Sequence, residues 1–419
     1  MRKRTFRFLL FVLVLLFQSG FASANNPSHI ALSWSEDPHT TQTITWKTDA
    51  DTAVGQVRYW QVMSGQPAGV QLADAQTENV ESNWGPFMLH TAVLKNLAPG
   101  TQYAYQVGAD EEWSTVSTFA TAGWRSKAFR FLIFGDSQSI HYDTWSDTLQ
   151  QAYQAQPTAA FFINMGDLVD RGADYGQWYD WFNAAAGVIN RIPCMPLVGN
   201  HETYALPGGF TRPLLFTAQF KVPQNGPTGL QGQVYSFNYG DVHFVMLDTQ
   251  IGEERSFTPD MLEEQKAWLA ADLASVTQKW TLIFLHRPLY NHRGGENTAL
   301  RKALLPIIDQ YHVDAVFSAH DHTYARSYPL YEGQIQADGR QGTIHIATGR
   351  SGSKTYADSA KSELDDFFYN PQAEPNYLSV EVENENLTVR AYQADGSLID
   401  EWRLEKVANP AALTERKAL

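Results

Sequence analysis

Cysteine is nearly absent from this sequence. Cys194 is the only cysteine among 419 residues, which excludes an internal disulfide. Its neighbours in PCMPLV are mostly apolar, so a thiol that fills the core is a better interpretation than a catalytic nucleophile. The core must therefore be held together by packing alone, and the chain has 12 Trp, 19 Tyr and 23 Phe with which to build it.

Positive charge is also scarce. The chain has 31 lysines and arginines against 45 aspartates and glutamates, a formal net charge of −14. Four of the basic residues lie within the first seven positions, so the rest of the chain is more acidic still. An acidic surface repels the phosphates of nucleic acids and the headgroups of anionic lipids. We therefore expect neither a nucleic-acid polymer nor a membrane surface as a partner.

Only one long apolar run exists, at residues 8–17, and it is too short to cross a bilayer comfortably. It follows a basic start and precedes Ala22-Ser23-Ala24, an order that is typical of a cleaved signal peptide. We expect a signal peptide over residues 1–24 and a secreted or periplasmic protein. Export without disulfides further indicates a bacterial source.

Residues 25–122 show an all-β pattern. Short alternating runs, HIALSW, TITW and QVRYW among them, are separated by turn residues. The stretch LKNLAPGTQYAYQVGA resembles the corner of fibronectin type III domains, which implies an Ig-like β-sandwich. Because no cluster of ionisable residues lies in this part, we expect it to serve in packing or recognition.

The pattern changes near residues 123–127 to apolar runs that alternate with amphipathic stretches such as DTWSDTLQQAYQAQ. This predicts an α/β domain over residues 128–405 whose strands are buried on both faces. A β-meander at its end is expected to close a second sheet, and residues 406–419 form a tail.

Five apolar runs of this domain end at residues that can bind a metal. These residues are Asp136, Asp167, Asn200, His286 and the pair His320 and His322. We expect them to lie along the carboxyl edge of one sheet, where open α/β folds bind ligands.

The five run ends read GDSQ, GDLVDRG, GNHE, LHRP and AHDHTYAR. In this order they resemble the calcineurin-like metallophosphoesterases. The sandwich in front of them, together with LHRPLY and HDHTYAR, resembles the purple acid phosphatase branch more closely. The resemblance covers nearly the whole chain after the leader. It implies an α/β domain with two mixed sheets flanked by helices, in four layers (α/β/β/α).

The residue types at these ends suit a metal centre. Aspartate, asparagine and histidine together favour Fe, Mn or Zn, and two ions about 3.5–4 Å apart need a shared carboxylate. The resemblance implies two metal ions, Fe with Zn or Mn, bridged by Asp167. The other implied ligands are Asp136 and His322 on one ion, and Asn200, His286 and His320 on the other.

The resemblance also implies the chemistry. His201, directly after Asn200, is not a ligand in the family but a general acid that stabilises the transferred phosphoryl group. A metal-bound hydroxide attacks in line, without a phosphoenzyme, and the expected substrate is a small phosphate monoester.

Two positions depart from the relatives. Asp170 stands where purple acid phosphatases have an iron-binding tyrosine, and Gln138 stands where most other metallophosphoesterases have a histidine. Either the Gln138 amide oxygen ligates the first metal or a water takes that place. The segment DLVDRG is similar to one in the Ser/Thr phosphoprotein phosphatases, which implies that Asp170 pairs with His201 and that Arg171 binds phosphate.

His292 and Arg350 are further candidates for binding phosphate. His292 follows His286 by six residues, and the alternative is an exposed loop histidine. Arg350, in the Gly/Ser-rich stretch TGRSGSK, is expected at the rim of the site.

Three functions remain open. The first is hydrolysis of phosphate monoesters, as in acid phosphatases, and the second is hydrolysis of diesters or nucleotides at the same site. The third is a non-catalytic secreted binding protein with a vestigial metal site. The ligand set is complete, which favours an enzyme. Neither the metal pair nor the oligomeric state follows from the sequence.

Overall fold

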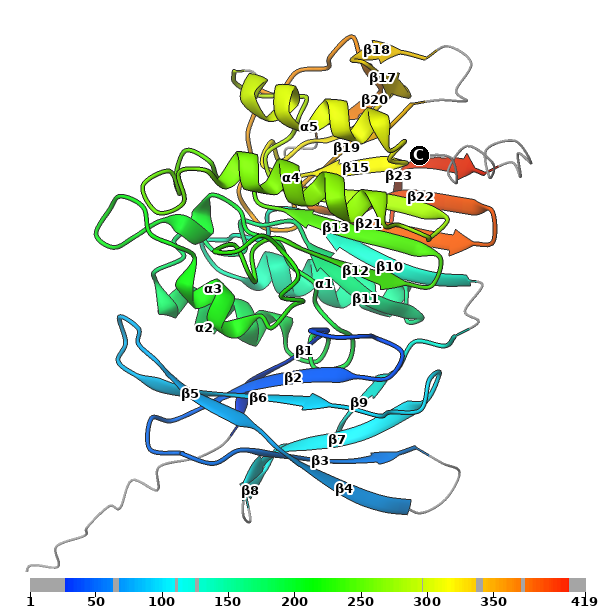
Figure 1. Cartoon of the computed structure of the whole chain (residues 1–419). Helices are drawn as coiled ribbons and strands as arrows, with labels where there is room; N and C mark the ends of the chain where they lie inside the picture. Colours follow the sequence, from blue (N-terminus) through cyan, green and yellow to red (C-terminus); the bar gives the residue numbers. More distant parts are fainter. Residues whose placement is uncertain are drawn as a thin grey trace, which may run out of the picture.

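The computed structural model describes residues 27–62, 68–109, 112–124, 128–295, 297–336, 342–370 and 374–406. The predicted signal peptide and all but the first residue of the predicted tail lie outside this part of the chain. Figure 1 shows an N-terminal β domain, in blue and cyan, packed against a larger α/β domain.

The N-terminal domain consists of two sheets, as the alternating runs predict. One sheet contains, in spatial order, β1 (Ser28–Ser33), β2 (Gln42–Thr48), β6 (Phe87–Leu94) and β5 (Gln76–Val80). The other contains β4 (Ala68–Asp74), β3 (Gln56–Gln61), β7 (Gln102–Ala109) and β8 (Glu112–Trp113), with β9 (Ser117–Ala120) paired to β7. Buried side chains such as Trp46, Val57 and Tyr105 fill the space between the sheets.

The α/β domain has two mixed sheets. The five-stranded sheet has the order β11 (Ala159–Asn164), β10 (Ala128–Phe134), β21 (Asn376–Glu383), β22 (Asn386–Gln393) and β23 (Leu398–Glu405). The seven-stranded sheet has the order β12 (Tyr235–Tyr239), β13 (Val242–Leu247), β14 (Trp280–Leu285), β15 (Ala315–Ser318), β19 (Ile344–Thr348), β16 (Tyr324–Ser327) and β20 (Asp365–Tyr369). A small hairpin pairs β17 (Leu330–Tyr331) with β18 (Gln334–Ile335).

Alternation along the buried strands produces the layers. On β10, Phe131 and Ile133 point into a core shared with Phe244 and Phe284 of the facing sheet. The intervening Leu132 and Phe134 pack against helices on the outer face. Both faces of each sheet are therefore apolar, which confirms the predicted α/β/β/α arrangement.

Helices cover the two outer faces. The helices on the side of the five-stranded sheet are α1 (Asp143–Ala155), α2 (Tyr175–Ala185) and the short α3 (Leu214–Gln219). Those on the seven-stranded sheet are α4 (Met261–Ala274) and α5 (Thr298–Gln310). In the described part of the chain, no helix combines the length and apolarity that a membrane crossing needs.

Two expectations about sheet membership are wrong. The candidate ligands that follow the apolar runs do not lie along the edge of a single sheet. The strands β10 and β11 belong to one sheet, and β14 and β15 belong to the other. Asn200 follows a segment that makes only an isolated bridge. The C-terminal meander does not close a second sheet but extends the first, because β21 pairs antiparallel with β10. An apolar run indicates burial and does not identify the pairing partner.

The N-terminal domain is built into the α/β domain. Trp34 lies in the core between the two α/β sheets, with its ring 5.3 Å from that of Phe161. The side chain of Asn83 accepts a hydrogen bond from the Tyr175 N–H (2.8 Å) at the first residue of α2 and donates to Asp174 (3.1 Å). A residue of the sandwich thus completes the cap of a helix of the α/β domain.

We expect Asn83→Ala to lower the free energy of unfolding by about 1 kcal/mol, because the first N–H of α2 loses its acceptor. Urea denaturation of the whole chain measures this. Asn79→Ala is the matched control, since the Asn79 side chain is exposed and contacts only Glu81 of the same domain. Equal stability of the two variants would contradict the capping role.

Candidate metal centre

Side chains from both sheets converge in two clusters that share Asp167. One cluster contains Asp167, His286 and His320, and the other contains Asp136, Asp167 and His322, with the candidate ligand atoms of each within 4.8 Å of one another. The amide oxygen of Asn200 lies 3.2 Å from His286 Nε2 and so joins the first cluster. The structure therefore brings together six of the seven predicted metal ligands.

The backbone at these residues is strained. Asp136, Asp167, His320 and His322 all have positive φ, between 36° and 69°, which side-chain-bearing residues rarely adopt. Gly166, with φ of 88°, precedes Asp167, and a Cβ there would lie 2.8 Å from His286 Nδ1. Such strain persists only where surrounding contacts enforce it, and it is concentrated at functional sites.

The imidazoles are oriented for metal binding. His286 donates from Nδ1 to the Met165 carbonyl (2.9 Å), and His322 donates from Nδ1 to the Lys354 carbonyl (2.6 Å). In the neutral form of each ring, Nε2 is therefore the atom that offers a lone pair to a metal. His322 Nε2 is buried, has no hydrogen-bond partner among the described residues, and lies 3.3 Å from an Asp136 oxygen.

Electron pairs facing one another in this way require a cation. The Asp167 carboxylate, 3.2 Å from His286 Nε2, outweighs burial and raises the pKa of His286 to about 9, so without a metal a proton takes the place of the cation between these two groups. Burial and the neighbouring His286 and Arg287 lower the pKa of His320 to about 2, which keeps that imidazole neutral. Carboxylates, imidazoles and an amide oxygen form a donor set that fits Fe, Mn or Zn.

Glu202 fixes the two loops that carry Asp167 and Asn200. Its buried carboxylate accepts hydrogen bonds from the N–H groups of Gly199, Asp167 and Leu168 (each 2.8 Å) and Val169 (3.3 Å). Burial and the Asp167 carboxylate raise the pKa of Glu202 to about 8, while the backbone donors oppose the shift. Glu202 is the last residue of the GNHE motif, but the motif alone does not indicate that this carboxylate binds the backbone of both loops.

His201 lies beside the metal clusters and is oriented by Asp170. Its N–H donates to Asp167 Oδ1 (2.9 Å), and its Nε2 lies 3.9 Å from Asp167 Oδ2. The ring donates from Nδ1 to the backbone carbonyl of Asp170 (2.7 Å), while the Asp170 carboxylate is farther away, at 3.6 Å. Asp170 therefore orients His201 mainly through its main chain.

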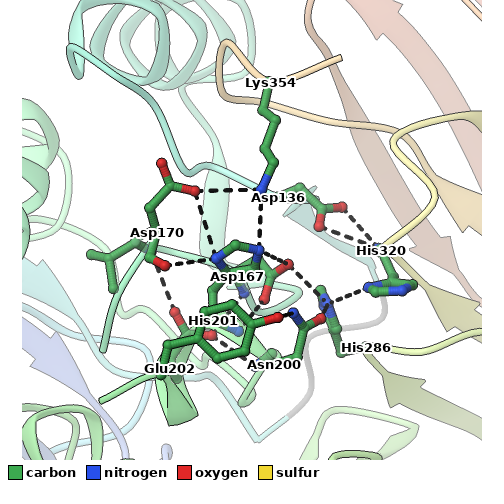
Figure 2. A network of polar contacts seen from close by, with 12 residues as sticks. Asp136, Asp167, Asp170, Asn200, His201, Glu202, His286, His320 and Lys354 are labelled. Carbon is green, nitrogen blue, oxygen red and sulfur yellow. Dashed lines mark hydrogen bonds and ion pairs between the residues drawn. The ribbon is translucent and has the colours of Figure 1, made fainter. Parts of the chain in front are cut away.

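Lys354 is a second residue that the sequence did not point to. Its ammonium lies 3.1 Å from His201 Nε2 and 3.4 Å from Asp170 Oδ1 (Figure 2). The Gln138 amide, oriented by its hydrogen bonds, accepts from Lys354 (3.1 Å) and donates to Asp170 (3.3 Å). Gln138 as a metal ligand stays a prediction, since its amide oxygen faces Lys354 here.

The three predicted phosphate-binding residues lie in different surroundings. Arg171 is exposed, next to Asp170. His292 is buried, with Nε2 3.0 Å from Asp365 and Nδ1 3.7 Å from Asp321, so its ring serves internal contacts. Arg350 is also buried rather than at the rim, and it lines a pocket of about 460 Å³ together with Ser353, Thr355 and Glu374.

An apolar wall lies next to His201. The ring of Tyr204 is 4.6 Å from that of His201, and the half-exposed Phe210 is 5.8 Å from Tyr204. Tyr204 is fixed by a hydrogen bond to its hydroxyl from Asn200 (2.8 Å).

Two family models match the chain. One, described as the purple acid phosphatase N-terminal domain, matches residues 27–121. The other, described as calcineurin-like phosphoesterase, matches residues 129–324.

Individual proteins are similar over most of the chain. A protein of Mycobacterium tuberculosis (strain ATCC 25618 / H37Rv) named only as uncharacterized is 27% identical over 387 residues, 80% of this chain and 72% of the relative. Acid phosphatase type 7 of Mus musculus is 26% identical over 389 residues, 82% of this chain and 83% of the relative. The solved structure of purple acid phosphatase PPD1 from yellow lupin seeds has the same fold, with a TM-score of 0.78 and 22% identity over 92% of this chain and 75% of that one. The two clusters, which share Asp167, offer ligands for two metal ions.

We expect Glu202→Ala to lower the free energy of unfolding by about 3 kcal/mol or more, because four backbone donors lose their buried acceptor. Glu202→Gln, which keeps one acceptor oxygen, should cost less. Urea denaturation measures both, and the bound metal found by elemental analysis should fall with the loss of stability. Glu263→Ala, at an exposed site on α4, is the control and should stay within about 0.5 kcal/mol of the parent.

His292 should make stability depend on pH. Its contacts with Asp321 and Asp365 outweigh burial and raise its pKa to about 9, above the ordinary 6.5. Its contribution, about 3 kcal/mol at most, is therefore complete below pH 6.5 and is lost as the pH rises through 9. Thermal unfolding between pH 6 and 10 should show a smaller decline for His292→Gln than for the parent. Parallel declines would show that the ion pair contributes nothing.

Proposed function

Since the chain joins a purple acid phosphatase N-terminal domain to a calcineurin-like phosphoesterase domain and is a metal-dependent phosphoesterase, we propose that it hydrolyses small phosphate monoesters. The observation that carries this proposal is the sharing of one buried carboxylate, Asp167, by two imidazole-containing clusters with His201 beside them. The proposed ligands are Asp136, Asp167, Asn200, His286, His320 and His322, whereas the amide oxygen of Gln138 faces Lys354.

The reaction transfers the phosphoryl group to water. Two bound metal ions, proposed as Fe with Zn or Mn, would supply Lewis-acid chemistry and activate the attacking water. The water oxygen forms a bond to phosphorus as the ester P–O bond breaks, and the products are an alcohol and inorganic phosphate. We assign to His201 the proton that the leaving oxygen takes up, because its Nε2 faces the clusters while its Nδ1 is held by Asp170.

The surroundings of His201 support small esters with an apolar leaving group. Tyr204 and Phe210 form an apolar wall at its side, against which an aryl group can pack. Arg171, which is exposed and follows Asp170 directly, is proposed to bind phosphate oxygens. We do not assign phosphate binding to His292 or Arg350, since both side chains are buried in internal contacts.

Two alternatives are weaker. A diesterase or nucleotide hydrolase would use the same metal clusters. It would differ from a monoesterase only in the residues around the clusters that contact the substrate. A non-catalytic binding protein would tolerate the loss of a ligand, yet the full Asp, Asn and His set is present and convergent. The basic and apolar N-terminus of the sequence supports export to the periplasm or the medium.

We expect Asp167→Asn to reduce hydrolysis of p-nitrophenyl phosphate to background, because the neutral amide can no longer offset the charge of two cations. Elemental analysis of the variant should show less than the two metal ions per chain expected for the parent. Asp51→Asn, at an exposed position of the N-terminal domain, is the matched control and should keep full activity and metal content.

The same assay tests the alternatives. Activity that survives Asp167→Asn would contradict a mechanism based on the two clusters. A parent enzyme that prefers bis(p-nitrophenyl) phosphate to p-nitrophenyl phosphate would be a diesterase. A parent that binds two metals but cleaves neither ester would support the binding protein.

A further inference from the structure

We propose that Lys354 binds the phosphate of the substrate and makes the site selective for monoesters, with Asp170 and Gln138 holding its ammonium in place. This role presupposes the phosphoesterase function proposed above. Nothing in the ligand motifs assigns it, because Lys354 lies in the loop after β19, six residues beyond the end of that strand.

The position of the ammonium is well determined by its contacts. Asp170 Oδ1 lies 3.4 Å away and the Gln138 amide oxygen 3.1 Å away, so two acceptors hold the group from one side. A lysine ammonium has three donors, and the third points to His201 Nε2 at 3.1 Å. Figure 2 shows Lys354 reaching His201 from the side opposite Glu202.

The third donor lies where a phosphate oxygen is needed. His201 Nε2, its partner, is also the ring atom that faces Asp167, the carboxylate common to both clusters. An oxygen of a phosphate bound at the clusters and next to His201 is therefore within reach of Lys354. The side chain of Lys354 is 31% exposed, so the ammonium borders the space that substrate enters.

Gln138 and Asp170 have no place in the two carboxylate–imidazole clusters, yet both are close to them in sequence. The backbone N–H of Gln138 donates to the Asp167 carbonyl (3.0 Å), and that of Asp170 donates to the Gln177 side chain (2.7 Å). Both backbones are thus fixed, and the contact that their side chains share is Lys354. This explains why a glutamine and an aspartate occupy these positions.

A cation at this place distinguishes the two classes of ester. A phosphate monoester carries nearly two negative charges at neutral pH, whereas a diester carries one and has an ester group in place of an oxygen anion. Lys354 can form a charge-assisted hydrogen bond with the additional oxygen of the monoester. The monoester therefore gains more from Lys354 than the diester does.

The test uses the full-length, metal-loaded protein and Lys354→Met, which keeps the length of the side chain without its charge. We expect kcat/KM for p-nitrophenyl phosphate to fall about 10- to 100-fold, as expected for the loss of one hydrogen bond to a charged group. The value for bis(p-nitrophenyl) phosphate should change by less than about 3-fold. The dissociation constant of inorganic phosphate, measured by calorimetry, should rise by a factor similar to the first, with the metal content unchanged.

Two further variants complete the test. Lys95→Met removes the same charge from an exposed ion pair of the N-terminal domain and should leave all values unchanged. Lys354→Arg keeps the charge and should restore most of the phosphate affinity if the site tolerates the larger group.

Each other outcome overturns the proposal or identifies what has failed. Equal losses on both esters, or an unchanged phosphate affinity, would overturn the role of Lys354 in selectivity or binding. Loss of metal from Lys354→Met would overturn a direct role of the ammonium, because it would show that the substitution disturbs the loop whose Lys354 carbonyl holds His322. If the parent hydrolyses neither ester, the proposed function is wrong, and the phosphate affinities of the parent and Lys354→Met still decide whether Lys354 binds the anion.

Discussion

The hydrogen bonds between the Glu202 carboxylate and the backbone of two loops are the contacts on which the rest of the site depends. They join Gly199, which precedes Asn200 and His201, to Asp167 and Leu168, which follow β11. Asp167 adopts a positive φ that costs energy, so it needs contacts that enforce it. Because one carboxylate satisfies donors from both loops, Asp167, Asn200 and His201 keep a fixed relative geometry before any metal or substrate binds.

The N-terminal domain takes part in this preorganisation. It buries Trp34 in the α/β core, and it supplies Asn83 to the start of α2. From that helix, the Gln177 side chain accepts hydrogen bonds from the N–H groups of Asp170 and Arg171. The sandwich is therefore linked through a single helix to the loop that orients His201, which makes it a structural part of the catalytic unit.

The site has two chemically different sides. On one side, carboxylates and neutral imidazoles converge and offer ligands to cations. On the other, Asp170 and Gln138 hold an ammonium next to His201 and offer a donor to an anion. These are the two positions at which the sequence departs from the motifs of the families it resembles, and in the role proposed for Lys354 both belong to a second binding surface. The proposed phosphate would lie between cations on one side and the Lys354 ammonium on the other.

Much of this protein could be predicted from the sequence, and the limits of the prediction have a physical reason. The β-sandwich followed by α/β layers was predicted correctly, and the structure brings six of the seven predicted ligands together, because strand periodicity and ligand chemistry are properties of short segments. Which sheet each strand joins, the role of Glu202, the burial of His292 and Arg350, and the approach of Lys354 to His201 were decided only in the tertiary structure. Lys354 and His201 lie 153 residues apart, and no local pattern reports a contact over that separation. The sequence by itself determined which residue types stand at the strand ends and could bind metals. Only the fold decided which charged side chains, Glu202 and Lys354 above all, lie beside them.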